Sequence, residues 1–206
     1  RSLLPGSVSE TGDPHGARPG AEAKAGPRPD GRAPRYEGSI LVAEAGRLLK
    51  EGADGPLFLW LHFMDPHGPY DPPGECRALF ENADYRLPGE DAPRLEDSNY
   101  GLGIIPRYQV FELQRNPADY RARYDAEIRY TDQQVGEVLE LLRRHRLLDS
   151  SVLVLAADHG ESLGEHDYYF QHGWFNYEDC LRVPLMIRAP GILPAGLRVA
   201  PTVSLV

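Results

Sequence analysis

The stretch VLVLAADHGESLGEHD, residues 152–167, changes within one residue from an apolar run to a polar loop. Residues 152–157 are typical of a short, fully buried β-strand. Ligands of open α/β sheets bind beyond the carboxyl ends of the strands, so Asp158 and His159 stand where such a fold places its chemistry. Gly160 allows a tight turn, and a carboxylate beside an imidazole suits a divalent cation. On its own, the Asp-His-Gly sequence is equally compatible with an ordinary turn.

A second apolar run precedes a second group of polar residues. Residues 57–63, LFLWLHF, read as a strand covered on both faces. They lead into MDPHGPY, residues 64–70, in which two prolines prevent both helix and strand from continuing. This segment is therefore expected to be a rigid turn that presents Asp65 and His67.

A long helix is expected between these two strands. Asn116 can cap it, Pro117 suits its first turn, and apolar residues recur every three to four positions as far as about Arg146. Strand, helix and strand in this order form a βαβ unit, whose strands are parallel. The carboxyl ends of both strands then face one edge of the sheet. His67 should therefore lie on the same side of the molecule as Asp158 and His159.

The remaining sequence predicts further parts of an α/β domain. A helix is expected over residues 38–50 and a third strand over 183–188, so the second half reads as a parallel sheet without its first strand. Residues 71–116 form a long Pro-rich loop, with possible short helices near 76–82 and 108–113, and so long a loop is usually functional. Residues 1–35 contain six Pro and six Gly, the composition of a disordered linker or insertion. The domain is expected to occupy residues 36–206.

Composition excludes several classes of partner. The net charge of −9 and the pI near 5.2 argue against binding to nucleic acid or to an anionic membrane surface. No apolar run approaches the roughly 18 residues of a membrane span, and no signal peptide is visible. Two cysteines support neither a disulfide framework nor a Cys-based zinc site. Both ends read as cuts through a longer protein.

Four of the seven histidines, His67, His159, His166 and His172, fall in loops that border predicted strands. The surrounding motifs, in chain order, are FMDPHGPY at 63–70, YDAEIRYTD at 124–132, ADHGESLGEH at 157–166, HG at 172–173 and RVPL at 182–185. In this order they resemble the sulfatases of the alkaline-phosphatase superfamily, over about residues 36–206. The resemblance implies an alkaline-phosphatase-like α/β fold, a mainly parallel sheet flanked by helices and incomplete at both ends.

The resemblance also implies roles for four residues. Asp158 and His159 match half of a metal site, usually Ca²⁺ in sulfatases, with Mn²⁺, Mg²⁺ or Zn²⁺ as alternatives. The metal would hold a sulfate oxygen and stabilise the charge that builds up during transfer. His67 matches the histidine that contacts the sulfuryl group or the leaving oxygen. His172 matches a position that is a lysine in many sulfatases, so the charge of the substrate and the preferred pH stay open.

One element of the family pattern does not occur in these residues. Sulfatases use a formylglycine nucleophile, made from Cys or Ser in a C-x-P-S-R-like motif, together with an upstream aspartate pair. Neither Cys76 nor Cys180 lies in such a motif. The nucleophile and the other half of the metal site are therefore expected upstream. These 206 residues alone are expected to be inactive. The parent would need a formylglycine-generating enzyme or an equivalent maturase.

The implied activity is hydrolysis of a sulfate ester of a small molecule or carbohydrate, as in an arylsulfatase. The alternatives are a phosphonate or phosphodiester hydrolase or a phosphoglycerol transferase of the same superfamily, or a non-catalytic protein that keeps the fold. Sulfatases commonly work outside the cytosol, which suggests a periplasmic, secreted or otherwise extracytoplasmic protein.

Glu161 and His166 are interpreted as loop residues whose hydrogen bonds shape the site rather than as metal ligands.

Overall fold

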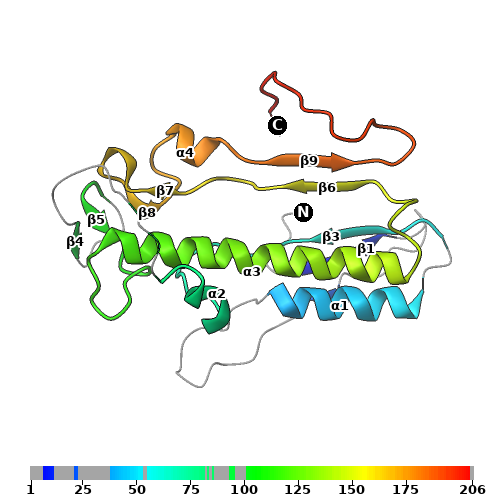
Figure 1. Ribbon diagram of the computed structural model, residues 1–206, viewed down its shortest axis with the longest axis horizontal. Coiled ribbons are helices and arrows are strands. Elements are labelled where there is room, and N and C mark those ends of the chain that lie inside the picture. Colours follow the sequence, from blue (N-terminus) through cyan, green and yellow to red (C-terminus); the bar gives the residue numbers. More distant parts are fainter. Residues whose placement is uncertain are drawn as a thin grey trace.

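A computed structural model describes residues 7–11, 21–22, 38–52, 55–81, 83, 85, 93–95 and 101–204. The helix α3, Pro117–Arg144, runs along the length of the molecule. The helix α1, Gly38–Glu51, packs beside the second half of α3, while β6 and β9 lie on the opposite side of α3 in the view of Figure 1. This arrangement leaves one end of the molecule to the loops that carry the candidate site.

The helix α3 begins at Pro117 as the sequence predicts and ends at Arg144, close to the predicted end at about Arg146. The Asn116 side chain accepts a hydrogen bond of 3.1 Å from the Ala118 amide, and Pro117 occupies the first turn. The predicted apolar face is only partly buried, because Ile128 is 45% exposed while the polar residue Glu127 is buried. One oxygen of the Glu127 carboxylate accepts a hydrogen bond of 2.7 Å from the Asp71 amide, which offsets part of the cost of its burial.

The helix α1 is connected to the turn that carries His67. The buried carboxylate of Asp65 accepts a hydrogen bond of 3.1 Å from the amide of Gly38, the first residue of α1. The first amides of a helix lack intrahelical partners and favour a negative charge. Asp65 therefore stabilises the start of α1 in addition to forming its turn.

The two strands that lead to the site run in the same direction. The strand β3, Phe58–Leu61, and the strand β6, Leu153–Ala156, both run toward the end of the molecule that holds β7 and β8 (Figure 1). The predicted common orientation of their carboxyl ends is confirmed. The two strands do not pair with each other, however. β3 is the edge of an antiparallel sheet of order β2-β1-β3, formed with β1, Ser7–Thr11, and β2, Ala21–Glu22.

The predicted parallel pairing of the third strand is wrong. The strand β9, Leu185–Arg188, pairs antiparallel to β6, with Leu153 opposite Arg188. A parallel neighbour would need the chain to cross back over the sheet before β9 begins. The residues after β6 instead stay at the site end, where they form β7, Ser162–Leu163, the 3-10 turn Glu165–Asp167, β8, Tyr169–Gln171, and α4, Glu178–Leu181 (Figure 1). The chain then runs directly back beside β6 as β9.

Burial of the central strands on both faces, expected from their apolar runs, is also not found. Phe58, Trp60 and Val154 are 54%, 51% and 63% exposed, whereas their neighbours along each strand are half-buried. Successive side chains of a strand point to opposite faces. Each strand is therefore covered on one face by the described residues and open on the other.

The loop over residues 71–116 contains less helix than expected. The helix α2, Gly74–Ala78, confirms one of the two predicted segments. Residues 108–113 form turns, since Glu112 and Leu113 have φ angles of 48° and 54°, in the left-handed region that a right-handed helix does not use. Two short strands, β4, Arg94–Leu95, and β5, Ile104–Ile105, pair in parallel. Residues 82, 84, 86–92 and 96–100 lie outside the described residues.

The predicted boundary at residue 35 stays a prediction. The strands β1 and β2 lie inside the segment that was expected to be a linker, so parts of that segment pair with each other and with β3. The rest of residues 1–37 lies outside the described ranges. None of the helices in the described part of the chain combines the length and the apolar character that crossing a membrane requires.

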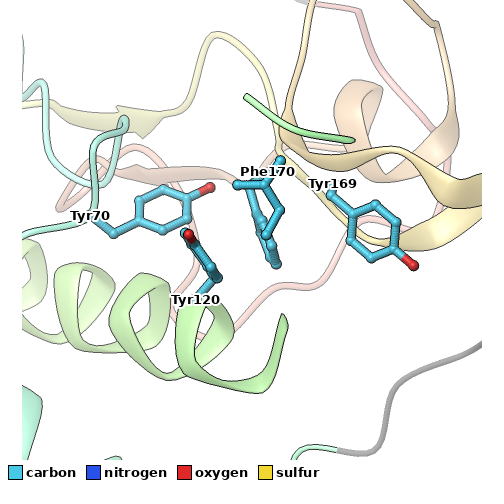
Figure 2. Packing of buried hydrophobic residues seen from close by; sticks show 5 residues of the cluster. Tyr70, Tyr120, Tyr169 and Phe170 are labelled. Carbon is cyan, nitrogen blue, oxygen red and sulfur yellow. The ribbon is translucent and has the colours of Figure 1, made fainter. Parts of the chain in front are cut away.

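An aromatic core supports the site end. Figure 2 shows Tyr70, Tyr120 and Phe170 pointing toward one another, with Tyr120 projecting from α3. The rings of Tyr120 and Phe170 stack with centroids 4.6 Å apart, and Tyr70 meets Phe170 edge-on at 6.3 Å. Tyr169 and Ile105 complete the cluster. Packed aromatic rings restrain one another strongly, so the His67 turn, α3 and β8 are fixed together.

Candidate functional site

Three histidines from three separate loops meet beyond the ends of β3, β6 and β8. The ring centroids of His159 and His172 are 3.8 Å apart, in a stacked arrangement. His67 meets these two rings edge-on, at 6.3 Å from His159 and 5.1 Å from His172. The residues expected to share one side of the sheet therefore form one cluster, although β3 and β6 are not hydrogen-bonded neighbours.

The turn after β3 fixes the orientation of His67. Its amide donates a hydrogen bond of 2.7 Å to the Met64 carbonyl, and its Nδ1 lies 2.8 Å from the Gly68 carbonyl oxygen. A carbonyl only accepts hydrogen bonds, so Nδ1 carries the proton of the neutral ring. A Cβ atom on Gly68 would lie 2.2 Å from the Gln109 side chain, which donates to the Phe170 carbonyl. Gln109 thus connects this turn to β8.

The loop after β6 orients His159 in the same way. Its Nδ1 lies 2.7 Å from the Gly160 carbonyl oxygen, which places the proton of the neutral ring on Nδ1 and the lone pair on Nε2. Asp158 accepts a hydrogen bond of 3.0 Å from the His159 amide and has a side chain that is 75% exposed. Gly160 is required by space: a Cβ atom there would lie 2.0 Å from the carbonyl oxygen of Asp179. The backbone of α4 therefore lies directly against this loop.

His172, which follows β8, is held by a buried carboxylate. Its Nδ1 lies 3.1 Å from Oε1 of Glu161, and the Tyr70 hydroxyl donates a hydrogen bond of 3.0 Å to Oε2 of the same carboxylate. The hydrogen bond to Glu161 raises the pKa of His172 above its usual value. Burial raises the pKa of Tyr70 well above its usual value, so its hydroxyl remains a donor. The interpretation of Glu161 as a residue that shapes the site through hydrogen bonds agrees with these contacts.

The described residues offer two neighbouring donors for a metal ion. The Asp158 Oδ1 and His159 Nε2 atoms lie 3.8 Å apart, and both side chains are accessible. Two donors that bind the same ion at about 2.0 to 2.6 Å each can be separated by up to about 4 to 5 Å, so this pair fits one cation. Within the described ranges, no group of three His, Cys, Asp or Glu residues is arranged to hold a metal.

Sequence reasoning missed the supporting residues around the histidines. Tyr70 and Gln109 carry no chemical signature of a site, and only contacts between distant segments identify them. The ring of His166 stacks instead on the ring of Tyr177, with centroids 4.2 Å apart. Trp174 and Phe175 follow His172 by two and three residues. They are 63% and 36% exposed and so lie outside the core.

Comparison with known families identifies the chain. The family model described as "Sulfatase" matches residues 15–206. The chain belongs to the sulfatase family. The family predicted from the motifs around His67, Asp158 and His172 is therefore confirmed. The match begins inside the segment that the composition favours as a linker.

Related proteins carry sulfatase names. The chain is 35% identical over 154 residues to a choline-sulfatase of Rhizobium meliloti, covering 73% of this chain and 30% of that protein. It is 32% identical over 166 residues to an iduronate 2-sulfatase of Mus musculus, covering 72% of this chain and 29% of that protein. The chain thus spans about 30% of the length of these relatives.

Solved structures support the fold. A protein solved in complex with its substrate D-glucosamine-2-N,6-O-disulfate has a TM-score of 0.57 and 20% identity, over 78% of this chain and 45% of that chain. The phosphonate monoester hydrolase of Agrobacterium radiobacter has a TM-score of 0.54 and 22% identity, over 77% of this chain and 35% of that chain. The predicted alkaline-phosphatase-like fold class is confirmed, with the corrections to strand pairing given above.

Proposed function

We propose that this chain forms the metal-binding and sulfate-contacting half of the active site of a sulfuric ester hydrolase. The single observation that carries the proposal is the convergence of His67, Asp158, His159 and His172 beyond the ends of three strands, with ring separations of 3.8 to 6.3 Å. Membership of the sulfatase family supports the choice of sulfate as the group transferred.

In this proposal Asp158 and His159 ligate a divalent cation. Asp158 supplies a carboxylate oxygen, and His159 supplies Nε2 because its Nδ1 is directed to the Gly160 carbonyl. Ca²⁺ is the first choice, and Mn²⁺, Mg²⁺ and Zn²⁺ are the alternatives. A bound cation would stabilise the negative charge of the sulfate oxygens. The remaining ligands would be supplied by residues outside the described set.

His67 and His172 are proposed to contact the substrate. With its Nδ1 directed to Gly68, His67 presents Nε2 to the sulfuryl group or to the leaving oxygen, where an imidazole can donate or accept a proton. His172, as the imidazolium that its hydrogen bond to Glu161 favours, is proposed to donate from Nε2 to a sulfate oxygen where many sulfatases have a lysine. Its half-buried ring, fixed between His159 and Glu161, suits directed hydrogen bonding better than a flexible ammonium group.

The nucleophile is proposed to be a formylglycine outside these 206 residues. Cys76 and Cys180 are both buried, and neither stands in the motif that such a conversion needs. A formylglycine-generating enzyme or an equivalent maturase would then act on the longer protein. The proposed substrate is a sulfate ester of a small molecule or carbohydrate, a class consistent with the names of the related proteins.

Alanine variants of the two proposed ligands test this assignment. In the longer protein that contains this chain, Asp158→Ala and His159→Ala should each abolish sulfate-ester turnover while the fold is kept. Asp132→Ala and His145→Ala are matched controls, because they remove an exposed carboxylate from α3 and an imidazole from its far end. Near-normal turnover in both Asp158→Ala and His159→Ala would refute the metal assignment.

Hydrolysis of a phosphorus ester is the second candidate. Phosphonate monoester hydrolases share this fold at 22% identity, which makes a phosphorus ester the alternative substrate to test. A retained fold without catalysis is the third possibility. Failure of the longer protein to bind a divalent cation would favour the non-catalytic alternative.

A further inference from the structure

A continuous series of hydrogen bonds connects the three loops that carry the histidines. Tyr70 belongs to the turn of His67, and Glu161 belongs to the loop of His159. The Tyr70 hydroxyl and the His172 Nδ1 bind opposite oxygens of Glu161, at 3.0 and 3.1 Å. A displacement of any one of the three loops would therefore disturb a hydrogen bond at Glu161.

The burial of Glu161 makes these two hydrogen bonds costly to lose. Its side chain is only 4% exposed, and a buried carboxylate needs a partner for each oxygen to offset its lost hydration. Oε1 has His172 and Oε2 has Tyr70 as partner. Because both oxygens are engaged with these side chains, the arrangement supports an orienting role better than a direct role in metal binding.

The Tyr70 end of this series of hydrogen bonds is anchored in the aromatic core. Tyr70 is 2% exposed, and its ring lies against Tyr124 at 5.3 Å and Phe170 at 6.3 Å. Its backbone carbonyl accepts a hydrogen bond of 3.1 Å from Arg123 on α3. The hydroxyl that holds Glu161 therefore has a fixed position.

We propose that Glu161 is a positioning residue, anchored by Tyr70, that fixes the His172 ring against His159 with its proton on Nδ1. His67 and His159 have their Nδ1 atoms directed to carbonyls within their own turns, whereas His172 depends on a side chain from another loop. Ligand-supporting hydrogen bonds of this kind fix the tautomer and the orientation of an imidazole. The kinetic part of this inference rests on the proposed sulfatase function.

Nuclear magnetic resonance tests the positioning role without any turnover. Long-range ¹H–¹⁵N spectra of the full chain, recorded where its imidazoles are neutral, should show His172 as the Nδ1–H tautomer, with the signal assigned by His172→Asn. Glu161→Ala should convert it to a mixture of tautomers. Glu161→Gln should preserve the Nδ1–H form, since an amide oxygen still accepts from Nδ1. A folded Glu161→Ala protein with an unchanged His172 tautomer would overturn the proposal.

Kinetics of the longer protein provide the second readout. Glu161→Ala should lower kcat/KM by about 10- to 100-fold, the usual cost of removing such a supporting residue, and Glu161→Gln should recover most of this loss. Glu137→Ala, which removes an exposed carboxylate from α3, should leave kcat/KM unchanged. Equal losses in Glu161→Ala and Glu161→Gln, or no loss in either, would contradict the role of the Glu161 oxygen.

Tyr70→Phe keeps the inference testable if Glu161→Ala does not fold. It retains the ring in the core and removes only the hydroxyl that binds Glu161. It should shift the His172 tautomer partly toward the mixture, and unchanged His172 signals in Tyr70→Phe would refute the anchoring by Tyr70. A longer protein that lacks sulfatase activity would refute the proposed function, whereas the tautomer of His172 would still decide the positioning role.

Discussion

The imidazole rings of His159 and His172 stack with centroids 3.8 Å apart and planes inclined by 24°. His159 follows β6, and His172 follows β8, so the contact joins the proposed metal half-site to the proposed sulfate contact. The edge-on approach of His67 to both rings completes the cluster. A change at any one of these positions is expected to affect the other two.

Replacement of His172 tests its proposed contact with sulfate. In the longer protein, His172→Ala should lower kcat/KM by about 10² to 10³, the usual effect of losing one donor to developing charge, because the imidazolium that Glu161 favours can donate from Nε2 while Nδ1 is bound to the carboxylate. His172→Lys should preserve more activity, because an ammonium group also donates to a sulfate oxygen. Steady-state kinetics, with circular dichroism to confirm folding, measure the difference. Equal losses in the two variants would count against a sulfate-contacting role.

Gly160→Ala is expected to destabilise the site loop. The added Cβ would meet the Asp179 carbonyl oxygen at 2.0 Å, and a backbone atom cannot move aside without moving α4. Steric insertions of this kind cost about 1 to 3 kcal/mol. Gly136→Ala is the matched control, because nothing lies within 4 Å of its Cβ position in α3 and alanine favours helix by about 0.5 to 1 kcal/mol. Urea denaturation should show a lower free energy of unfolding for Gly160→Ala and a higher one for Gly136→Ala. Equal free energies of unfolding for the two variants would contradict the close contact at Gly160.

The buried tyrosines predict a loss of stability at alkaline pH. Burial raises the pKa of Tyr120 and Tyr124 to about 12 and raises the pKa of Tyr70 well above its usual value of 10. The folded chain therefore keeps protons that the unfolded chain loses above pH 10. The stabilisation is complete below that pH and declines as the pH rises toward 12. Ultraviolet titration should show a late group of tyrosines, and a single ionisation step near pH 10 would contradict their burial.

The two thiols are expected to react slowly. Burial raises the pKa of Cys180 to about 11 and also raises the pKa of Cys76, so little of either side chain is thiolate at pH 8. Iodoacetamide should modify both residues much more slowly in the folded chain than in urea. Mass spectrometry of the modified chain measures each rate. Rapid modification of Cys180 under native conditions would contradict its burial.

The local signals predicted single elements better than they predicted the pairing of the strands. The Asn116 cap, the Pro117 start and the turn after residue 63 depend on neighbouring residues, and the structure has each of them. The pairing of β9 depends on the path of the chain between β6 and β9, which no short pattern encodes. The exposure of Phe58 and Val154 likewise depends on what covers the sheet.

The supporting contacts could not be predicted, because they join residues far apart in sequence. The sequence predicts that Glu161 shapes the site through hydrogen bonds, but it does not indicate the partners Tyr70 and His172, which are 91 and 11 positions away. Nothing in a tyrosine's sequence context separates an anchoring hydroxyl from a core ring. Gln109, which is buried against Gly68, is a further example.

The most direct test of the central claim is turnover by the longer protein, co-expressed with a formylglycine-generating enzyme. Matched nitrophenyl sulfate, phosphate and phosphonate esters would be compared with and without a chelator. A metal-dependent sulfatase should cleave the sulfate ester in preference to the other two and should lose that activity with the chelator. Preference for a phosphorus ester, or sulfate cleavage that the chelator leaves unchanged, would contradict that claim.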